Sequence, residues 1–337
     1  MIVTIRDVAK KSGYSITTVS RALNGFDDVN EETRKKIMAV AKELNYKPNR
    51  VARSLVSKTV NTIGLFVLGR SSFQQGFISD IVSGLIDEAS GYDFDLLIFG
   101  TQSLKIGLPF HQFCHQRGVG GAVITGLKIT DPIIAELETG EFPTVLIDVP
   151  INGAKATYVT FDNQEGMIKA IAHLYQLGHR KMGFINGHQE AWVCRERLAG
   201  YRRGLAKYGL PYQEEYVFNG DFTKESGRKG ARILKERNPE LTAFLVASDL
   251  MAVGVLEELT ALGFGIPEDL SVIGFDDQTF AAHTSPALTT IRQDEYRLGK
   301  SAAQTIIKLI NIPDFTPQVE TLNTSLVVRG STGKIKA

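Results

Sequence analysis

The sequence predicts a mixed α/β protein, in which a small all-α head precedes a larger core of two parallel α/β subdomains. Three observations point to this fold class. A chain of 337 residues is too long for one ordinary hydrophobic core. Two short amphipathic helices separated by a glycine turn fit residues 4–24. Strand-like apolar runs alternate with helical segments over residues 60–330.

The composition indicates a soluble protein of a reducing compartment. Hydrophobic residues make up 43% of the chain and charged residues 22%. No apolar run reaches the roughly 18 residues of a membrane span, and charges at Arg6 and Asp7 interrupt any signal-peptide stretch. The two cysteines, Cys114 and Cys194, form no C-x-x-C motif. We expect a cytoplasmic protein with no membrane partner and no disulfide framework.

Charge is distributed unevenly along the chain. Residues 1–58 contain 12 Lys and Arg against 6 Asp and Glu, whereas the remainder contains 26 against 31. A basic head on a mildly acidic body suits contact with a polyanion such as nucleic acid. A solvated helical face would give the same charge count, so the sequence pattern must decide between them.

The pattern in the head predicts a helix-turn-helix. Thr4 begins a capping box, and the apolar spacing predicts a helix over 5–11 that Gly13 ends. Ser15 is a good N-cap for a second helix over 16–23. In a helix-turn-helix the second helix presents its N-terminal side chains to base edges in the major groove. The outward candidates on the second helix are Ile16, Thr17 and Arg21. The other predicted DNA-contacting residues of the head are Thr4, Ser15, Thr18 and Asn24.

A third helix and a short proline-led segment follow. Asn30 is the predicted N-cap of the third helix, which ends near Asn45 ahead of Pro48. Pro48 can open a further short helix, but about ten residues form only a marginal helix in water. We therefore expect this segment to fold only when a partner holds it.

The core shows two series of strand and helix units. Parallel sheets bind ligands at the carboxyl ends of their strands, so two such series suggest two subdomains with a cleft between them. The predicted strands are 62–68, 95–99, 121–125, 144–147, 181–185, 242–246 and 270–275. The predicted helices are 77–90, 109–116, 132–138, 195–207, 226–236, 250–262 and 294–310.

Several motifs carry a family resemblance. The strings TIRDVAKKSGYSITTVSRALNG and NEETRKKIMAVAKELNYKPNRVARSL resemble the head and hinge helix of the lactose and purine repressor family of bacterial transcriptional regulators. Further matching strings follow in family order, and the resemblance runs from Thr4 to Ser331. They are DNQEG, LGHRKMGFING, RLAGYRRGL, SDLMAVG, LSVIGFDD and LTTIRQD.

The resemblance implies a domain organisation. It gives a helix-turn-helix domain over 1–46, a hinge helix and linker over 47–59, and a periplasmic-binding-protein-like core over 60–337 that binds effector and dimerises. The chain would cross three times between subdomain one (60–161 and 293–322) and subdomain two (162–291 and 323–331).

The resemblance also implies how the head and hinge meet DNA. Asn49, Ala52 and Arg53 would contact DNA, and Leu55 would enter the minor groove beside its symmetry mate. A homodimer would place two recognition helices about 34 Å apart, so the double-stranded operator should be nearly palindromic.

Effector-binding residues follow from the matched motifs. Arg197 would donate its planar fork to effector hydroxyls or a carboxylate, Asp276 would accept from sugar hydroxyls, and Phe222 would provide an aromatic platform. Phe77, Ser248 and Gln293 are weaker matches, and Trp192 is a candidate only because it lies close to Arg197 in the sequence. Core packing of the two phenylalanines and a structural Arg–Asp pair are the alternatives.

The sequence favours a repressor whose operator affinity depends on a small effector, first a sugar or sugar phosphate. An activator or dual regulator that responds to a nucleobase or a phosphoprotein corepressor is the alternative. An exported solute-binding protein would have no use for the head. We expect no enzyme and no cofactor, because G-x-S-x-G and H-E-x-x-H are absent. For His111, Cys114 and His115 a solvated helix face is favoured over a metal site.

Overall fold

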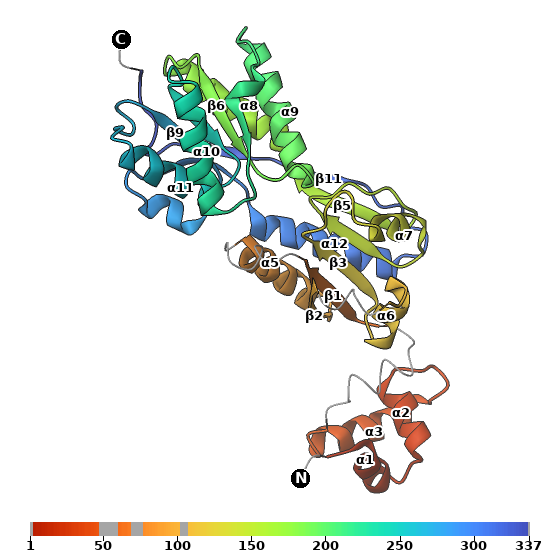
Figure 1. Ribbon diagram of the computed structural model, residues 1–337. Helices are drawn as coiled ribbons and strands as arrows, with labels where there is room; N and C mark the ends of the chain where they lie inside the picture. Colours follow the sequence, from red (N-terminus) through yellow and green to blue (C-terminus); the bar gives the residue numbers. More distant parts are fainter. Residues whose placement is uncertain (1–2, 47–59, 69–76, 102–106, 336–337) are drawn as a thin grey trace. The chain divides into compact units, whose positions relative to one another are not determined.

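The computed structural model describes residues 3–46, 60–68, 77–101 and 107–335. The chain forms two compact units divided after Asn61, and each is described by itself (Figure 1). The expected hinge helix over 47–59 lies outside the described residues. So do four of the predicted DNA-contacting residues, namely Asn49, Ala52, Arg53 and Leu55.

The head is a small helical cluster. Gly13 adopts φ 78° after the first helix, a left-handed conformation that favours glycine, and this turn redirects the chain into the second helix. Val8, Val19 and Ile37 are fully buried, one from each helix, and form the centre of the head core. The helices within residues 3–46 are α1 (Ile5–Ser12), α2 (Ile16–Leu23) and α3 (Glu31–Glu43).

Subdomain one is built on a parallel sheet with strand order β11-β5-β4-β3-β1-β2. Alternate residues of its strands face opposite layers, so Leu65 packs with α5 and α12 while Phe66 packs with α6. The strands are β1 (Thr62–Val67), β2 (Asp95–Gly100), β3 (Gly121–Thr125), β4 (Thr144–Ile147), β5 (Ala156–Phe161) and β11 (Glu320–Leu322). The helices are α5 (Phe77–Gly91), α6 (Phe110–Gln116), α7 (Ile133–Thr139) and α12 (Glu295–Asn311).

Subdomain two repeats this architecture with strand order β12-β10-β9-β8-β6-β7, in which only β12 pairs antiparallel among the described strands. One core layer joins the sheet to α8 and α9, and the other joins it to α10 and α11. The strands are β6 (Met182–Asn186), β7 (Val217–Asn219), β8 (Ala243–Val246), β9 (Ser271–Asp276), β10 (Thr289–Arg292) and β12 (Ser325–Val327). The helices are α8 (Asn163–Gln176), α9 (Trp192–Lys207), α10 (Lys224–Arg237), α11 (Asp249–Ala261), η3 (Glu214–Tyr216) and η4 (Thr279–His283).

Three short connections join the two sheets. The chain leaves β5 for α8, returns from β10 to α12, and passes from β11 to β12 (Figure 1). These connections bring the carboxyl ends of both sheets together, which is where parallel α/β proteins bind ligands. The predicted α/β fold class, with a helical head, is confirmed.

One expectation for helix α6 is wrong in part. His111 and His115 are exposed, but the Cys114 side chain is fully buried, so the three residues do not share a solvated face. Burial raises the pKa of Cys114 to about 12, which keeps this thiol protonated at neutral pH. None of the helices in the described part of the chain has both the length and the apolar composition of a membrane-spanning segment.

Candidate effector cavity and recognition helix

Helix α2 has the geometry expected of a recognition helix. Ser15 Oγ accepts a hydrogen bond from the Thr18 backbone N–H at 3.1 Å and lies 2.8 Å from Thr18 Oγ1, so both hydroxyls serve the helix start. Ile16, Thr17 and Arg21 are exposed, with Ile16 at 46%. The face opposite the head core therefore presents an apolar, a hydroxyl and a cationic side chain.

Two other predicted DNA contacts have local partners. The Thr4 backbone N–H and hydroxyl donate to Asp7 Oδ2 at 2.8 and 2.7 Å, which caps α1. Asn24 Nδ2 donates to Ser20 Oγ at 3.4 Å just after α2. Both residues stabilise helix ends, so their contact with DNA remains a proposal.

Arg21 has a partner that the sequence did not indicate. Its Nε donates to Asp28 Oδ1 at 3.0 Å, and its Nη2 lies 2.5 Å from Asp28 Oδ2. The guanidinium carbon also lies 5.0 Å from the centre of the Phe26 ring. This predicted DNA-contacting arginine is thus held in place by the loop that follows its own helix.

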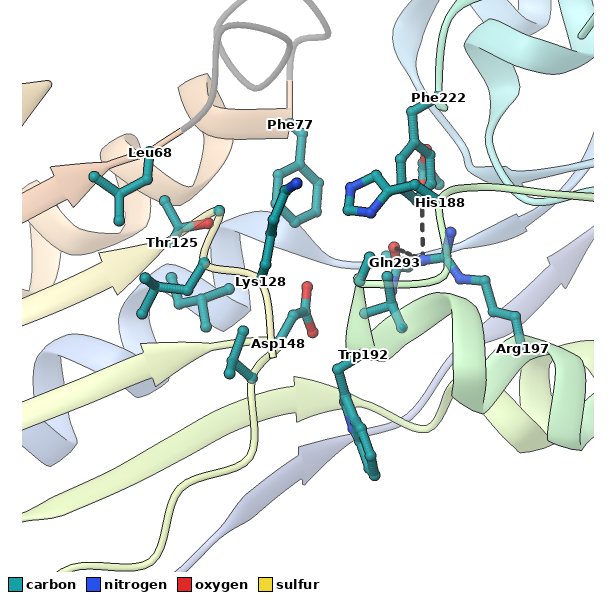
Figure 2. A pocket seen from close by; sticks show the side chains of 17 residues that line it. Leu68, Phe77, Thr125, Lys128, Asp148, His188, Trp192, Arg197, Phe222 and Gln293 are labelled. Carbon is teal, nitrogen blue, oxygen red and sulfur yellow. Dashed lines mark hydrogen bonds and ion pairs between the residues drawn. The ribbon is translucent and has the colours of Figure 1, made fainter. Parts of the chain in front are cut away.

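A cavity of about 300 Å³ lies between the two subdomains (Figure 2). Six of the seven predicted effector-binding residues line it, namely Phe77, Trp192, Arg197, Phe222, Asp276 and Gln293. The other lining residues are Leu68, Thr125, Gly126, Leu127, Lys128, Ile147, Asp148, Val149, His188, Ala191 and Val193. Apolar walls with a few convergent polar groups are typical of small-molecule sites.

The seventh predicted residue, Ser248, does not line the cavity. Its side chain is buried at the start of α11, where Oγ accepts from the Met251 backbone N–H at 3.3 Å. Ser248 is therefore an N-cap residue, and the structure gives it a role within the fold rather than in the cavity.

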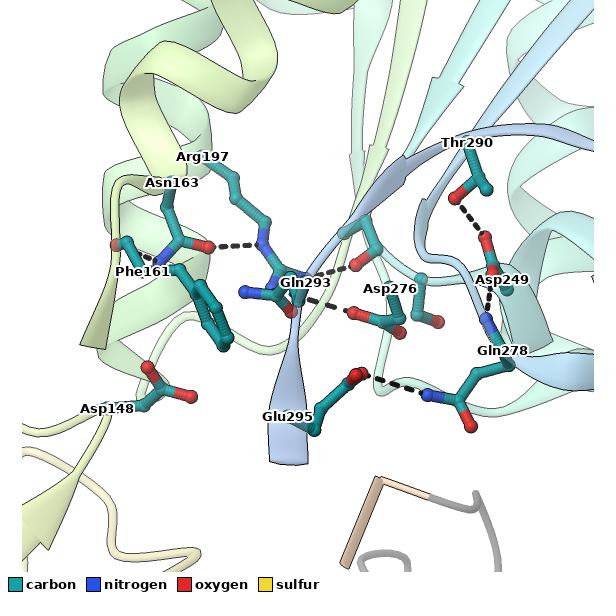
Figure 3. Close-up of polar contacts among 12 residues, drawn as sticks. Asp148, Phe161, Asn163, Arg197, Asp249, Asp276, Gln278, Thr290, Gln293 and Glu295 are labelled. Atoms are coloured by element: carbon teal, nitrogen blue, oxygen red, sulfur yellow. Dashed lines mark hydrogen bonds and ion pairs between the residues drawn. The ribbon is translucent and has the colours of Figure 1, made fainter. Parts of the chain in front are cut away.

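Arg197 is the centre of the polar network (Figure 3). Nε donates to Asn163 Oδ1 at 2.8 Å, and Nη1 donates to the Ala247 carbonyl. Nη2 donates to Gln293 Oε1 at 3.3 Å and lies 3.8 Å from Asp276 Oδ1. These contacts leave further N–H groups of the fork for a ligand, because a guanidinium has five N–H donors.

Two lining residues have unpartnered polar atoms. Gln293 turns Oε1 toward Arg197, because arginine can only donate hydrogen bonds. No described residue accepts a hydrogen bond from the buried Nε2 of Gln293. His188 Nδ1 likewise has no partner among the described residues. An unsatisfied buried polar group is destabilising, so both atoms favour a ligand or water in the cavity.

Two carboxyl groups come from the ends of strands in different subdomains. Burial raises the pKa of Asp276 to about 7, although the Arg197 guanidinium opposes the shift. Burial also raises the pKa of Asp148, against a hydrogen bond from Thr160 Oγ1 at 2.7 Å and the charge of Arg197. The sequence prediction missed Asp148, although an acidic residue directly after β4 is the signal that could have found it.

Aromatic rings form part of the wall. Phe77 and Phe222 face the cavity from opposite subdomains, and the His188 ring packs edge-on against Phe222 with centres 5.5 Å apart (Figure 2). The indole of Trp192 points away from these rings (Figure 2). Burial lowers the pKa of His188, which keeps its imidazole neutral at pH 7. Two aromatic rings and a neutral imidazole in the lining suit a flat or hydroxyl-rich ligand.

A second polar group of residues lies beside the Arg197 network (Figure 3). Asp249 accepts from Thr290 Oγ1 at 2.6 Å and from the Gln278 backbone N–H at 2.8 Å. Gln278 Nε2 donates to Glu295 Oε1 at 3.1 Å, which links subdomain two to the first turn of α12. Burial raises the pKa of Glu295 to about 9, so this carboxyl is protonated at neutral pH.

Comparison with known proteins agrees with this geometry. Residues 4–49 match bacterial regulatory proteins of the lacI family, and residues 171–332 match a periplasmic binding protein-like domain. The chain is 31% identical over 336 residues to the probable HTH-type transcriptional repressor ExuR of Bacillus subtilis (strain 168), covering 99% of each chain. The chain belongs to the lacI family.

Other lacI-family proteins agree over nearly the whole length. The HTH-type transcriptional regulator CelR of Thermobifida fusca is 34% identical, over 97% of this chain and 98% of the relative. A CelR–cellobiose complex superposes with TM-score 0.75 at 32% identity, covering 98% of this chain and 99% of the other. A lac repressor dimer bound to operator and the anti-inducer ONPF gives TM-score 0.81 at 29% identity, covering 99% and 100%. This lacI-family chain is an effector-controlled, DNA-binding transcriptional repressor.

Proposed function

We propose that this cytoplasmic repressor binds a neutral sugar in the cavity between its subdomains, and that the sugar sets the affinity of a homodimer for a nearly palindromic operator. The observation that carries this proposal is the set of polar groups at the cavity. Asp148 and Asp276 can accept from hydroxyl groups, while Arg197 and Gln293 can donate. The relative CelR forms a complex with the sugar cellobiose, which supports this ligand class.

The charges at the cavity favour a neutral sugar over a sugar phosphate. The lining contains two cationic side chains, Lys128 and Arg197, and two carboxyl groups, Asp148 and Asp276. Lys128 is already paired with Glu190, and His188 stays neutral. A phosphate dianion would meet two carboxyl groups without a free cationic cluster, whereas sugar hydroxyls can both donate and accept.

Control of DNA binding would come from closure of the cleft. Lys128 and Glu190 are on different subdomains, as are Gln278 and Glu295, so both contacts depend on how the subdomains meet. A sugar that contacts both walls binds one closure state more tightly and shifts the population toward it. The hinge residues Asn49, Ala52, Arg53 and Leu55 would transmit that change to DNA, as the family resemblance implies.

The cavity would bind its ligand without chemical turnover. Its described lining contains no serine or cysteine nucleophile, and Arg197 can only donate hydrogen bonds to a ligand. Incubating the protein with the bound sugar and recovering it chemically unchanged would support this reading. A hydrolysed product would contradict it.

A thermal-shift screen of the full chain tests the proposed ligand class. We expect neutral mono- or disaccharides to raise the melting temperature, because a ligand that binds only the folded state stabilises it by mass action. Sugar phosphates and purines form the comparison panels. A shift from either of those panels alone would contradict the neutral-sugar proposal.

A further inference from the structure

We propose that Asp28 is a positioning and specificity-determining residue, which holds Arg21 so that the outer edge of its guanidinium donates to guanine. This inference rests on the repressor function and on a contact between Arg21, an exposed residue of the recognition helix, and a base edge. It concerns a second residue, in the loop after the recognition helix, that the sequence prediction did not assign to DNA recognition.

The contact between the two side chains leaves the useful edge of the guanidinium open. Asp28 accepts from Nε at 3.0 Å and from Nη2 at 2.5 Å, a two-point pairing on the side edge of Arg21. Of the five N–H groups, this leaves both on Nη1 and one on Nη2. A parallel Nη1/Nη2 pair is the fork that matches guanine O6 and N7 in the major groove.

The loop that carries Asp28 is itself held in place. The Phe26 backbone N–H donates to the Arg21 carbonyl at 3.1 Å, and Arg34 Nη2 donates to the Phe26 carbonyl at 2.7 Å. Val29 is buried in the head core directly after Asp28. The Phe26 ring, 5.0 Å from the guanidinium carbon, gives Arg21 a further contact. An arginine fixed in this way loses less rotamer freedom when it binds a base.

The charge of Asp28 also affects how strongly the protein distinguishes one DNA sequence from another. A carboxylate beside a DNA-reading side chain repels phosphates, so it weakens binding to every sequence. If it also orients Arg21, it strengthens only the sequences that carry guanine at the contacted position. Since an exposed ion pair adds little to folding stability, its effect should appear in DNA selectivity rather than in the melting temperature.

Selection from a duplex library with randomised base pairs tests this inference with the full-length protein. We compare the unchanged protein with Arg21→Ala, Asp28→Asn and the control Asp27→Asn, which removes the same charge from the neighbouring exposed position. Arg21→Ala should abolish a guanine preference at one position of each half-site. Asp28→Asn should reduce that preference roughly tenfold, the scale of one bidentate base contact, and raise affinity for random DNA. Asp27→Asn should raise affinity for random DNA only.

The outcomes separate the two proposals. If Arg21→Ala keeps every base preference, Arg21 does not contact a base, and both the base contact and the proposed role of Asp28 are wrong. If Arg21→Ala loses the guanine preference while Asp28→Asn keeps it, only the role of Asp28 is wrong. A sharper guanine preference in Asp28→Asn would make Asp28 a competitor for Arg21 and also overturn the inference. Asp28→Ala, tested in the same way, replaces Asp28→Asn if that variant does not fold.

Discussion

Lys128 Nζ lies 2.5 Å from Glu190 Oε2, and this ion pair joins subdomain one to subdomain two beside the cavity. The Ile129 backbone N–H donates to the Glu190 carbonyl at 3.0 Å, and Thr130 Oγ1 donates to Glu190 Oε1 at 3.4 Å. The contacts therefore converge on one residue of the segment between β6 and α9. They can persist only while the two subdomains keep this closure.

Removing the charge of Glu190 should lower the affinity of the protein for its effector. In Glu190→Gln the closed arrangement loses its ion pair, so we expect less than a tenfold loss of sugar affinity by calorimetric titration. Added salt should weaken binding by the unchanged protein and have less effect on the variant, because salt screens exposed charges. Glu214→Gln, an exposed change on η3, is the control. Equal affinities and equal salt dependence in both variants would show that the pair does not contribute to closure.

Asp276→Asn should weaken sugar binding by about 1.5–3 kcal/mol, the range for hydrogen bonds to charged groups. The change keeps the shape of the side chain and removes its charge. Calorimetric titration measures the loss, and the melting temperature reports the fold. Full sugar affinity in a folded Asp276→Asn protein would make the contact between Asp276 and Arg197 a structural pair only.

Arg197→Lys should harm both stability and binding. A single ammonium cannot reproduce the contacts to Asn163, Ala247 and Gln293, so buried acceptors would be left unsatisfied, at about 1–3 kcal/mol each. Denaturant unfolding should therefore show a lower free energy of unfolding than for Asp276→Asn. Unchanged stability would mean that water or other side chains replace these contacts.

Effector affinity should depend on pH through Asp276. Sugar hydroxyls that donate to Asp276 stabilise its ionised form, so affinity should fall as pH falls through about 7. Titrations at pH 6 and pH 8 measure this, and Asp276→Asn should flatten the response. The groups that act on Asp276 are Arg197 and Asp148, with a backbone contact at Asp249.

The same pKa has the opposite consequence for the free protein. Because the folded-state pKa of Asp276 lies above its ordinary value of 3.8, its contribution to stability is fully present below about pH 4 and is lost as pH rises through about 7. The ligand-free protein should therefore lose stability between about pH 4 and 7 relative to Asp276→Asn, and level off above that range. Parallel stability curves for the two proteins would show that Asp276 ionises normally.

Gly84→Ala should destabilise subdomain one. A Cβ at Gly84 would lie 2.0 Å from the Tyr296 carbonyl oxygen, so α5 and α12 would have to separate. We expect a loss of about 1–3 kcal/mol in denaturant unfolding, as for other overpacked sites. The control is Gly91→Ala at the end of the same helix, where a Cβ would meet nothing within 4 Å. Equal stability of the two variants would contradict close packing of these helices.

Local signals predicted much of the fold. Caps at Thr4, Ser15 and Asn30 and the apolar spacing between them placed the three head helices to within one or two residues. The predicted strands over 121–125 and 144–147 coincide with β3 and β4. Each of these elements is specified by its own residues and their immediate neighbours, which is why sequence patterns suffice.

Features that depend on distant residues escaped prediction. Helix α9 begins at Trp192 rather than near 195, because its N-cap Ala191 gives no side-chain signal. Ser248 lies in a motif that predicted effector binding, but its side chain caps a helix. Only the folded structure distinguishes these two roles. The pairs Lys128 with Glu190 and Arg21 with Asp28 join residues that no local period connects.

The most direct test of control by the cavity is operator affinity measured with and without the sugar that gives the largest thermal shift. We would use fluorescence anisotropy of a duplex recovered from the library selection. Saturating sugar should change the affinity of the unchanged protein by at least about fivefold. Asp276→Asn should bind the operator normally without sugar and respond only at higher sugar concentrations. An unchanged operator affinity at sugar concentrations that demonstrably saturate the protein would contradict control through this cavity.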